Sequence, residues 1–429
     1  MRWPRTIGDD SLLREPSFAP FWFAHTVSEA GSRITFVVAP ILVYQLTGSA
    51  LNTGILAALQ AVPYLLFGLI AGATTDRANR RRVMVGCNVA QAGLLASIPL
   101  AAATDSLGVV QIYVVAVLSA SLFVWFDAAN FGALPMLVGR DRLVEANSAI
   151  WAASSVVAVA GPAVGGVLAA TMGPANAIGL DAASYALSAL ALVFVRKPLS
   201  SKRTDGTALE PLARRIVADI REGLHYLWNQ RLVRTLTLLG FGDAFTAGAV
   251  TGLLVVFSVR ALGTSEDGAE IGLLYSVGAA GGLASALLLP RMNRRYPVGW
   301  ITLAGLSTVF LCTVALALTT QLALALAVFF AFNAGQTLVI INGISLRQQV
   351  TPLHLQGRVN VSARMVAWGG MPFGAAIGGA LAQIVSIRTT YLVMAVGVGL
   401  STLIGWYSPL RTRAGTQTLS TSDASGSAR

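Results

Sequence analysis

The sequence is poor in charge: Asp, Glu, Lys and Arg together account for 11% of its 429 residues. Because soluble proteins carry about 25% charged residues, this scarcity argues against a soluble protein. Apolar runs of about 20 residues recur along most of the chain, and each is long enough to cross the hydrocarbon core of a bilayer. The runs are continuously apolar rather than alternating, which favours membrane-spanning helices over the strands of a β-barrel.

Other absences narrow the chemistry. Cys87 and Cys312 both lie in apolar runs, so no disulfide framework is expected. No Walker A motif occurs, which argues against ATP-driven export by this chain. No cluster of Cys and His indicates a metal site, and we expect no metal, no cofactor and no enzymatic activity. The charged N-terminus lacks a small-residue cleavage pattern, so the first apolar run is expected to be a retained helix.

The apolar runs predict an all-α membrane protein with twelve transmembrane helices. Their approximate bounds are residues 18–46, 51–75, 83–104, 107–138, 147–171, 174–195, 232–261, 270–290, 298–320, 322–346, 359–386 and 389–409. The longest polar segment is central. It divides the chain into a six-helix half (1–197), a linker (198–230) and a second six-helix half (231–409). The linker's apolar spacing predicts an amphipathic helix on the cytoplasmic membrane face, and residues 410–429 have the composition of a disordered tail.

Positive charge is unevenly divided between the predicted loops. If the N-terminus is cytoplasmic, nearly all loop arginines fall on the cytoplasmic side, and Arg260 and Arg388 fall outside. This bias predicts a multi-pass protein of the cell (inner) membrane with both termini in the cytoplasm. It also accounts for the formal net charge of +11 without a nucleic-acid partner.

Three sequence matches at nearly one spacing indicate an internal repeat. GATTDRANRRR (72–82) matches ALLLPRMNRRY (286–296) at an offset of 214. GPAVGG (161–166) matches GAAIGG (374–379), and Asn147 matches Asn360, both at an offset of 213. Six spans in each repeat give the two halves the same orientation, as in transporters whose halves rock about a central site.

The first of these segments resembles the signature loop of the major facilitator superfamily, G-x-x-x-D-R-x-x-R-[RK]. The matching positions are Gly72, Asp76, Arg77, Arg80 and Arg81. AGPAVGG in span 5 is similar to the motif of exporters in this superfamily, carried here by Gly161, Pro162, Gly165 and Gly166. The stretches LVYQLTGSALNTGILAALQAVP, ANSAIWAASSVVAVAGPAVGG and VTPLHLQGRVN look like the branch of enterobactin-type siderophore exporters and macrolide-efflux proteins.

The resemblance implies roles for some of these positions. Asp76 would contact the cytoplasmic start of span 11, which carries Arg358, and so latch the two halves in the outward-facing state. The other matching positions of the signature loop would belong to the same latch. An acid near a helix N-terminus is favoured by the helix dipole. Pro290 stands in place of the aspartate in the second repeat, so the sequence does not support an equivalent second latch. The Gly161-Pro162 step would bend span 5 and act as a hinge and seal.

Ionisable side chains inside spans are costly unless they are paired or hydrated, so each is a functional candidate. His25, Glu29 and Arg33 are spaced i, i+4 and i+8, which places them on one face of span 1, with Glu29 near the midplane. Asp243 of span 7 corresponds in the repeat to Ala30, so the halves are predicted to project one acid each from matching depths. Asp127 is the acid of span 4.

Two interpretations of these acids remain open. In one, Glu29 and either Asp127 or Asp243 bind and release protons, because low-dielectric surroundings favour the neutral carboxylic acid. In the other, Glu29 and Arg33 are a fixed ion pair, and Asp127 caps a kink or bonds a neighbouring helix. Asp181 in span 6 is expected to be structural.

Uncharged side chains extend the candidate cavity. Its polar candidates are Asn130, Asn333, Gln336 and Asn342. Trp125, Phe126, Phe241 and Phe245 either form an aromatic wall for a flat organic cargo or fill helix contacts. Gly68 and Gly72 form a GxxxG pair, which permits close helix approach.

These features predict a monomeric secondary transporter in the bilayer, with a small-molecule substrate and protons as its partners. The favoured function is proton-coupled export of an amphiphilic drug, antibiotic or siderophore-like metabolite. An importer of the same fold is the alternative, and a non-transporting membrane sensor is a third hypothesis.

Overall fold

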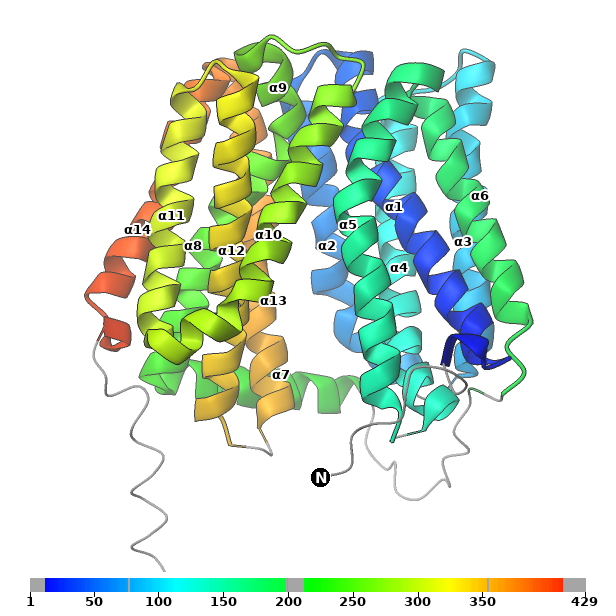
Figure 1. Ribbon diagram of the computed structural model, residues 1–429, viewed down its shortest axis with the longest axis horizontal. Coiled ribbons are helices and arrows are strands. Elements are labelled where there is room, and N and C mark those ends of the chain that lie inside the picture. The colour runs from blue at the N-terminus through cyan, green and yellow to red at the C-terminus, as the bar shows by residue number, and fades with distance from the viewer. Residues whose placement is uncertain are drawn as a thin grey trace, which may run out of the picture. The chain divides into compact units, whose positions relative to one another are not determined.

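The computed structural model describes residues 12–75, 78–139, 141–197, 199, 212–352 and 355–411, and these fold into helices (Figure 1). The helices up to the linker are α1 (Phe18–Thr47), α2 (Ala50–Thr75), α3 (Arg80–Ala103), α4 (Val109–Val138), α5 (Leu143–Met172) and α6 (Pro174–Val193). The linker helix is α7 (Leu212–Asn229). The remaining helices are α8 (Arg231–Gly252), α9 (Leu254–Leu262), α10 (Ala269–Arg295), α11 (Val298–Leu318), α12 (Leu322–Val350), α13 (Gln356–Ile384) and α14 (Ile387–Trp406).

Eleven helices in the described residues are long and apolar enough to cross a membrane. The pair α8 and α9 passes the same test together and bends by 57° at Leu253, which makes twelve spans if the pair counts as one. The predicted all-α membrane fold is therefore confirmed. Span 7 therefore consists of two helices, and Asp243 belongs to the longer one, α8.

The short turns between spans are built from residues that end helices. Gly173 separates α5 from α6 with a φ of 83°, a conformation that side chains with a Cβ rarely adopt. Pro174 then opens α6 at its first position, where the missing N–H costs no helical hydrogen bond. Gly139 (φ 77°) follows α4 in the same way. These local signals explain why the predicted bounds of spans 4 and 6 lie close to the observed ones.

The chain divides into two compact units. The first contains the described residues within Met1–Leu46, Val62–Ala208 and Asp267–Gly272, so it includes the start of α10. In this unit α3 packs along α6 and α4 (Figure 1). A cluster of buried side chains joins their ends to α1, including Phe18 and Phe21 of α1, Met84 of α3 and Leu192 of α6.

The second unit contains Thr47–Ala61, the described residues within Leu209–Glu266, and those within Leu273–Arg429. Here α11 packs along α12 and α14, as α3 packs along α4 and α6 in the first unit. The internal sequence repeat therefore has a counterpart in the packing. The end of α7 joins this unit, because Leu227 is buried with Val233 and Val359, and the Tyr226 hydroxyl donates to the Val350 carbonyl at 3.0 Å.

Candidate functional site

Glu29 lies in the middle of α1 and has several partners within the first unit. Its Oε1 accepts a hydrogen bond from an Arg33 terminal nitrogen at 3.2 Å. Its Oε2 accepts one from the Ser154 hydroxyl at 2.5 Å, and the His25 Nε2 lies 3.6 Å from the same oxygen. The helical i, i+4 spacing brings His25 and Arg33 to Glu29 from either side. The Glu29 side chain keeps 19% exposure, so it is not sealed in the protein interior.

The exporter-like motif of α5 packs against this same stretch of α1. A Cβ built at Gly161 would lie 2.7 Å from the Cβ of Arg33, and one at Gly165 would lie 3.0 Å from the Cα of Ile34. Ser154 precedes Gly161 by two helical turns, so it lies on the same face of α5. The glycines let α5 approach α1 closely, and this approach places the Ser154 hydroxyl against Glu29. Pro162 lies inside α5, which continues through it.

The last glycine of the motif makes a different contact. Gly166 meets the start of α10, where a Cβ at Gly166 would lie 2.9 Å from the Cα of Gly272 and 2.4 Å from the carbonyl oxygen of Gly268. In the second unit its repeat counterpart, Gly379 of α13, meets Gly54 of α2, and a Cβ at Gly54 would lie 2.9 Å from the Cα of Gly379. Each repeat thus contributes one glycine-on-glycine helix crossing, because only backbones without side chains can approach so closely.

Asp243 lies in the second unit and is more enclosed than Glu29. It is 3% exposed, and its Oδ1 accepts a hydrogen bond from the Gln336 amide of α12 at 3.3 Å. Asn333, one turn before Gln336, donates instead to the carbonyl of Phe329 at 2.9 Å. Of the three predicted amides on α12, Gln336 is therefore the one that the structure joins to the acid.

On α4 the consecutive residues of the predicted cavity point in different directions. Asp127 is exposed, and its charge acts on His25 together with that of Glu29, so the acids of α1 and α4 belong to one electrostatic group. Phe126 is buried in the core of the first unit, so for this ring helix packing is the correct interpretation. The Asn130 side-chain oxygen is buried and has no hydrogen-bond partner among the described residues.

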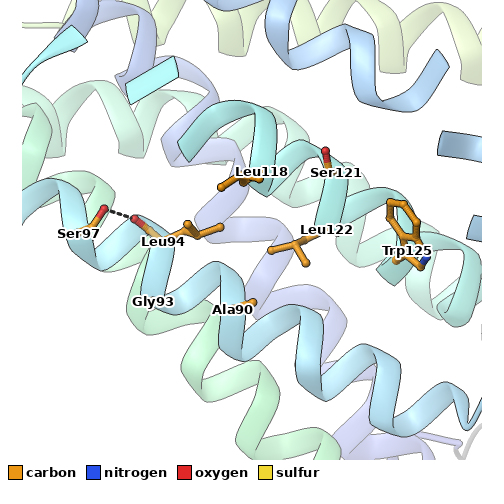
Figure 2. Close-up of a pocket in the computed structure, with 8 residues that line it drawn as sticks. All are labelled: Ala90, Gly93, Leu94, Ser97, Leu118, Ser121, Leu122 and Trp125. Carbon is orange, nitrogen blue, oxygen red and sulfur yellow. Dashed lines mark hydrogen bonds between the residues drawn. The ribbon is translucent and has the colours of Figure 1, made fainter. Parts of the chain in front are cut away.

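Trp125 turns away from Phe126. Its ring packs against Phe67 of α2, with centroids 5.3 Å apart, and its Nε1 donates to the Thr74 hydroxyl at 3.1 Å. Trp125 ends a pocket of about 530 Å³ between α3 and α4, which Figure 2 shows. The pocket is lined by Ala90, Gly93, Leu94, Ser97, Leu118, Ser121, Leu122 and Trp125. Ser97 and Ser121 bond backbone carbonyls of their own helices, so the surface offered to a guest is apolar.

The arginines of the signature loop hold the start of α3 within the first unit. Arg80 lies across Gly132 of α4 and donates to the sulfur of Met136 at 2.8 Å. Arg81 donates to the Val193 carbonyl at the end of α6, where the helix dipole favours a cation. Asn79 caps α3 by accepting from the Arg82 amide at 3.2 Å. The sequence assigned these arginines a topogenic and latching role, and the structure adds this bracing of three helices.

The structure does not describe the side chains of three other predicted members of the latch. Asp76 and Arg77 lie outside the described residues. Arg358 lies in the first turn of α13, and its side chain is outside the described part. Gly68 and Gly72, whose spacing permits a close helix approach, make none here, because no described atom comes within 4 Å of a Cβ built at either residue.

Residues 21–371 match the family described as Major Facilitator Superfamily.

The chain belongs to the major facilitator superfamily.

Relatives in this superfamily include exporters. The chain is 30% identical over 395 residues to the multidrug efflux pump Tap of Mycolicibacterium fortuitum, covering 90% of this chain and 94% of that protein. It is 25% identical over 380 residues to the enterobactin exporter EntS of Salmonella choleraesuis, covering 86% and 87%. The resemblance to the drug and siderophore exporter branch is thereby confirmed.

Solved structures of the superfamily share the fold. A bacterial homologue of the human lysosomal transporter Spinster aligns with a TM-score of 0.75 at 14% identity, covering 93% of this chain and 97% of that one. A bacterial homologue of the iron transporter ferroportin aligns with a TM-score of 0.73 at 16% identity, covering 93% and 99%. At these identities the likeness concerns the fold alone.

Within this superfamily fold, the sequence missed residues that the structure brings forward. Ser154 was not a candidate because it carries no charge, although its spacing from Gly161 placed it on the motif face. The carboxylate of Asp181, which we expect to be structural, accepts from Thr35 at 2.5 Å and from Ser184 at 3.0 Å. Ser184 lies one helical turn from Asp181, as the sequence spacing allows, whereas the contact with Thr35 of α1 follows only from the tertiary structure.

Proposed function

We propose that this transporter exports a small amphiphilic organic molecule in exchange for protons, by alternating access. The observation that carries the proposal is the cluster around Glu29. One carboxylate inside a span contacts a histidine, an arginine and a serine, and the serine belongs to the helix with the exporter-like motif. Ionisable groups placed in spans commonly mark proton pathways.

Protonation of Glu29 would weaken its contacts with its neighbours. A neutral carboxylic acid no longer forms an ion pair with Arg33 or with a protonated His25, and its bond from Ser154 loses its charge-assisted character. Because Ser154 and Gly161 share one face of α5, a change at Glu29 acts directly on α1–α5 packing. If α5 has two arrangements against α1, a proton that binds better to one of them shifts the population toward it, and this shift can drive transport.

The cargo class follows from the relatives and the lining of the first unit. The named pumps export drugs or a siderophore. The pocket between α3 and α4 offers an apolar surface to the apolar part of such a molecule. We further propose that the protein acts as a monomer with both termini cytoplasmic, and that Asp76 and Arg358 latch the halves as the resemblance implies.

The test is transport into inside-out membrane vesicles with an imposed pH gradient and a panel of amphiphilic dyes and antibiotics. We expect gradient-dependent uptake by the wild type, loss of uptake with Glu29→Gln, and unchanged uptake with the loop variant Glu266→Gln. Uptake that ignores the gradient would contradict proton coupling. Movement of every active substrate in the opposite direction would favour the importer.

A further inference from the structure

Acidic residues are absent from a long part of the second unit. From Ile271 to Ser422 the sequence contains no Asp or Glu, while arginines continue through α10, α12, α13 and α14. Most of these arginines lie near helix ends, where water or lipid headgroups can reach them. A cation buried among these helices has no acid nearby in sequence to neutralise it.

Arg347 is such a cation. It lies in the last turn of α12 and is 7% exposed. Its Nε is buried and meets no hydrogen-bond acceptor among the described residues. Another cation, Arg364 of α13, lies close enough to repel it.

The described surroundings of Arg347 do not offset the energetic cost of burying its charge. A buried cation without a counter-charge is strongly destabilising, and the C-terminal end of a helix offsets only part of that cost. The helix dipole alone is therefore insufficient. A counter-anion would supply the missing interaction.

Neutral polar groups on the same two helices are also unsatisfied. Asn342 of α12 is fully buried, and neither atom of its amide has a partner among the described residues. On α13 the Asn360 side-chain oxygen and the Ser362 hydroxyl are in the same situation. Buried polar atoms are nearly always hydrogen-bonded, so such a concentration points to an ion or water that belongs there.

The Trp368 ring, which packs against Arg364, can report anion binding in this region through its fluorescence. The guanidinium carbon of Arg364 lies 4.6 Å from the centroid of the Trp368 ring, and Trp368 is 40% exposed. The charge of Arg364 therefore acts on an aromatic ring that a ligand can reach. An anion that pairs with Arg364 would change the surroundings of this ring.

We propose that the ends of α12 and α13 toward their connecting loop form an anion-binding site, centred on Arg347 and flanked by Arg364. The ligand is a carboxylate or phosphate group, because the planar guanidinium matches both with two parallel hydrogen bonds. The group comes either from a soluble anion, the cargo included, or from a phospholipid headgroup. The site does not depend on the direction of transport or on proton coupling at Glu29.

The experiment uses the full-length protein in nanodiscs of phosphatidylcholine. Thermal unfolding and tryptophan fluorescence are measured with rising inorganic phosphate or benzoate, at constant ionic strength kept with chloride. We expect both anions to raise the melting temperature of the wild type. Arg347→Gln should bind at least about tenfold more weakly, Arg347→Lys should be intermediate, and the exposed-arginine control Arg294→Gln should respond like the wild type. The fluorescence response should disappear in Trp368→Phe.

A second arm replaces part of the phosphatidylcholine with phosphatidylglycerol and adds no soluble anion. An Arg347-dependent stabilisation in this arm alone assigns the site to a lipid headgroup, and one in the first arm assigns it to a soluble anion. Without any anion, Arg347→Gln should be at least as stable as the wild type, because it removes an unpaired buried charge. If neither arm gives a response that depends on Arg347, or if Arg347→Gln is strongly destabilised without anion, the proposal is wrong.

Discussion

Each repeat carries an acid at nearly the same position, Glu29 in the first and Asp243, which aligns with Ala30, in the second, and the surroundings of these two acids differ. Glu29 of α1 contacts His25, Arg33 and Ser154 and keeps 19% side-chain exposure. Asp243 of α8 is 3% exposed, and the hydrogen bond to its carboxylate comes from a neutral amide. Matching depth in a repeat therefore does not imply matching chemistry.

The two carboxylates differ in how easily water reaches them, which matters for proton exchange. A group that exchanges protons with an aqueous path must be reached by water, and the Glu29 side chain keeps 19% exposure. The backbone around Asp243 is tightly packed, since a Cβ at the adjacent Gly242 would lie 2.5 Å from the Gly397 carbonyl oxygen. As part of the proposed function, we therefore propose that proton exchange takes place in the first repeat.

The largest expected effect tests this assignment directly. Glu29→Gln should reduce gradient-driven export by at least about tenfold, the range expected when the coupling between two ligands is lost. Asp243→Asn should change it by less than about threefold, because asparagine still accepts the bond from Gln336. Both rates are measured in inside-out vesicles and corrected for the amount of folded protein. The opposite order of the two variants would assign the proton to α8.

The two glycine crossings provide the second test. A methyl at Gly166 would lie 2.4 Å from the Gly268 carbonyl oxygen, whereas one at Gly379 would lie 3.0 Å from that of Ala50. Overpacking of this kind costs about 1–3 kcal/mol, so Gly166→Ala should lower the melting temperature and export more than Gly379→Ala.

Gly86→Ala is the matched control for these variants, because no described atom comes within 4 Å of a Cβ at Gly86. It should be neutral or slightly stabilising, since alanine favours a helix. Equal effects of Gly166→Ala and Gly86→Ala would show that the crossing of α5 and α10 has no functional weight.

The smallest effect concerns the link between α1 and α5. Ser154→Ala removes one hydrogen bond to Glu29 and leaves Arg33 in place, so export should fall by about threefold, as expected for a net contribution of 0.5–1.5 kcal/mol. The neighbouring Ser155, whose hydroxyl bonds the Trp151 carbonyl within its own helix, provides the control Ser155→Ala. A loss as large as that of Glu29→Gln would mean that Ser154 itself carries the proton path.

The signature loop shows how far a motif can be interpreted from sequence. Its arginines were predicted to hold a cytoplasmic end, because positive charge resists translocation. The same arginines reach Met136 and Val193 on α4 and α6, which no local pattern indicates. A motif gives the type and spacing of its residues, whereas the neighbours they contact depend on which helices the fold places beside them.

The sequence by itself determined the membrane class, the helical spans and the repeat, because each depends on hydropathy, periodicity or local spacing along one chain, and its motifs carried the resemblance to the superfamily. Only the tertiary structure decided which face of each helix meets which neighbour. Trp125 and Phe126 are adjacent in sequence, yet one lines a pocket and the other lies in the core. Glu29 accepts from Ser154, Asp243 accepts from Gln336, and the Nε of Arg347 has no hydrogen-bond partner among the described residues. Helical periodicity fixes which residues share a face, but the rotation of that face toward a partner is set by packing between segments distant in sequence.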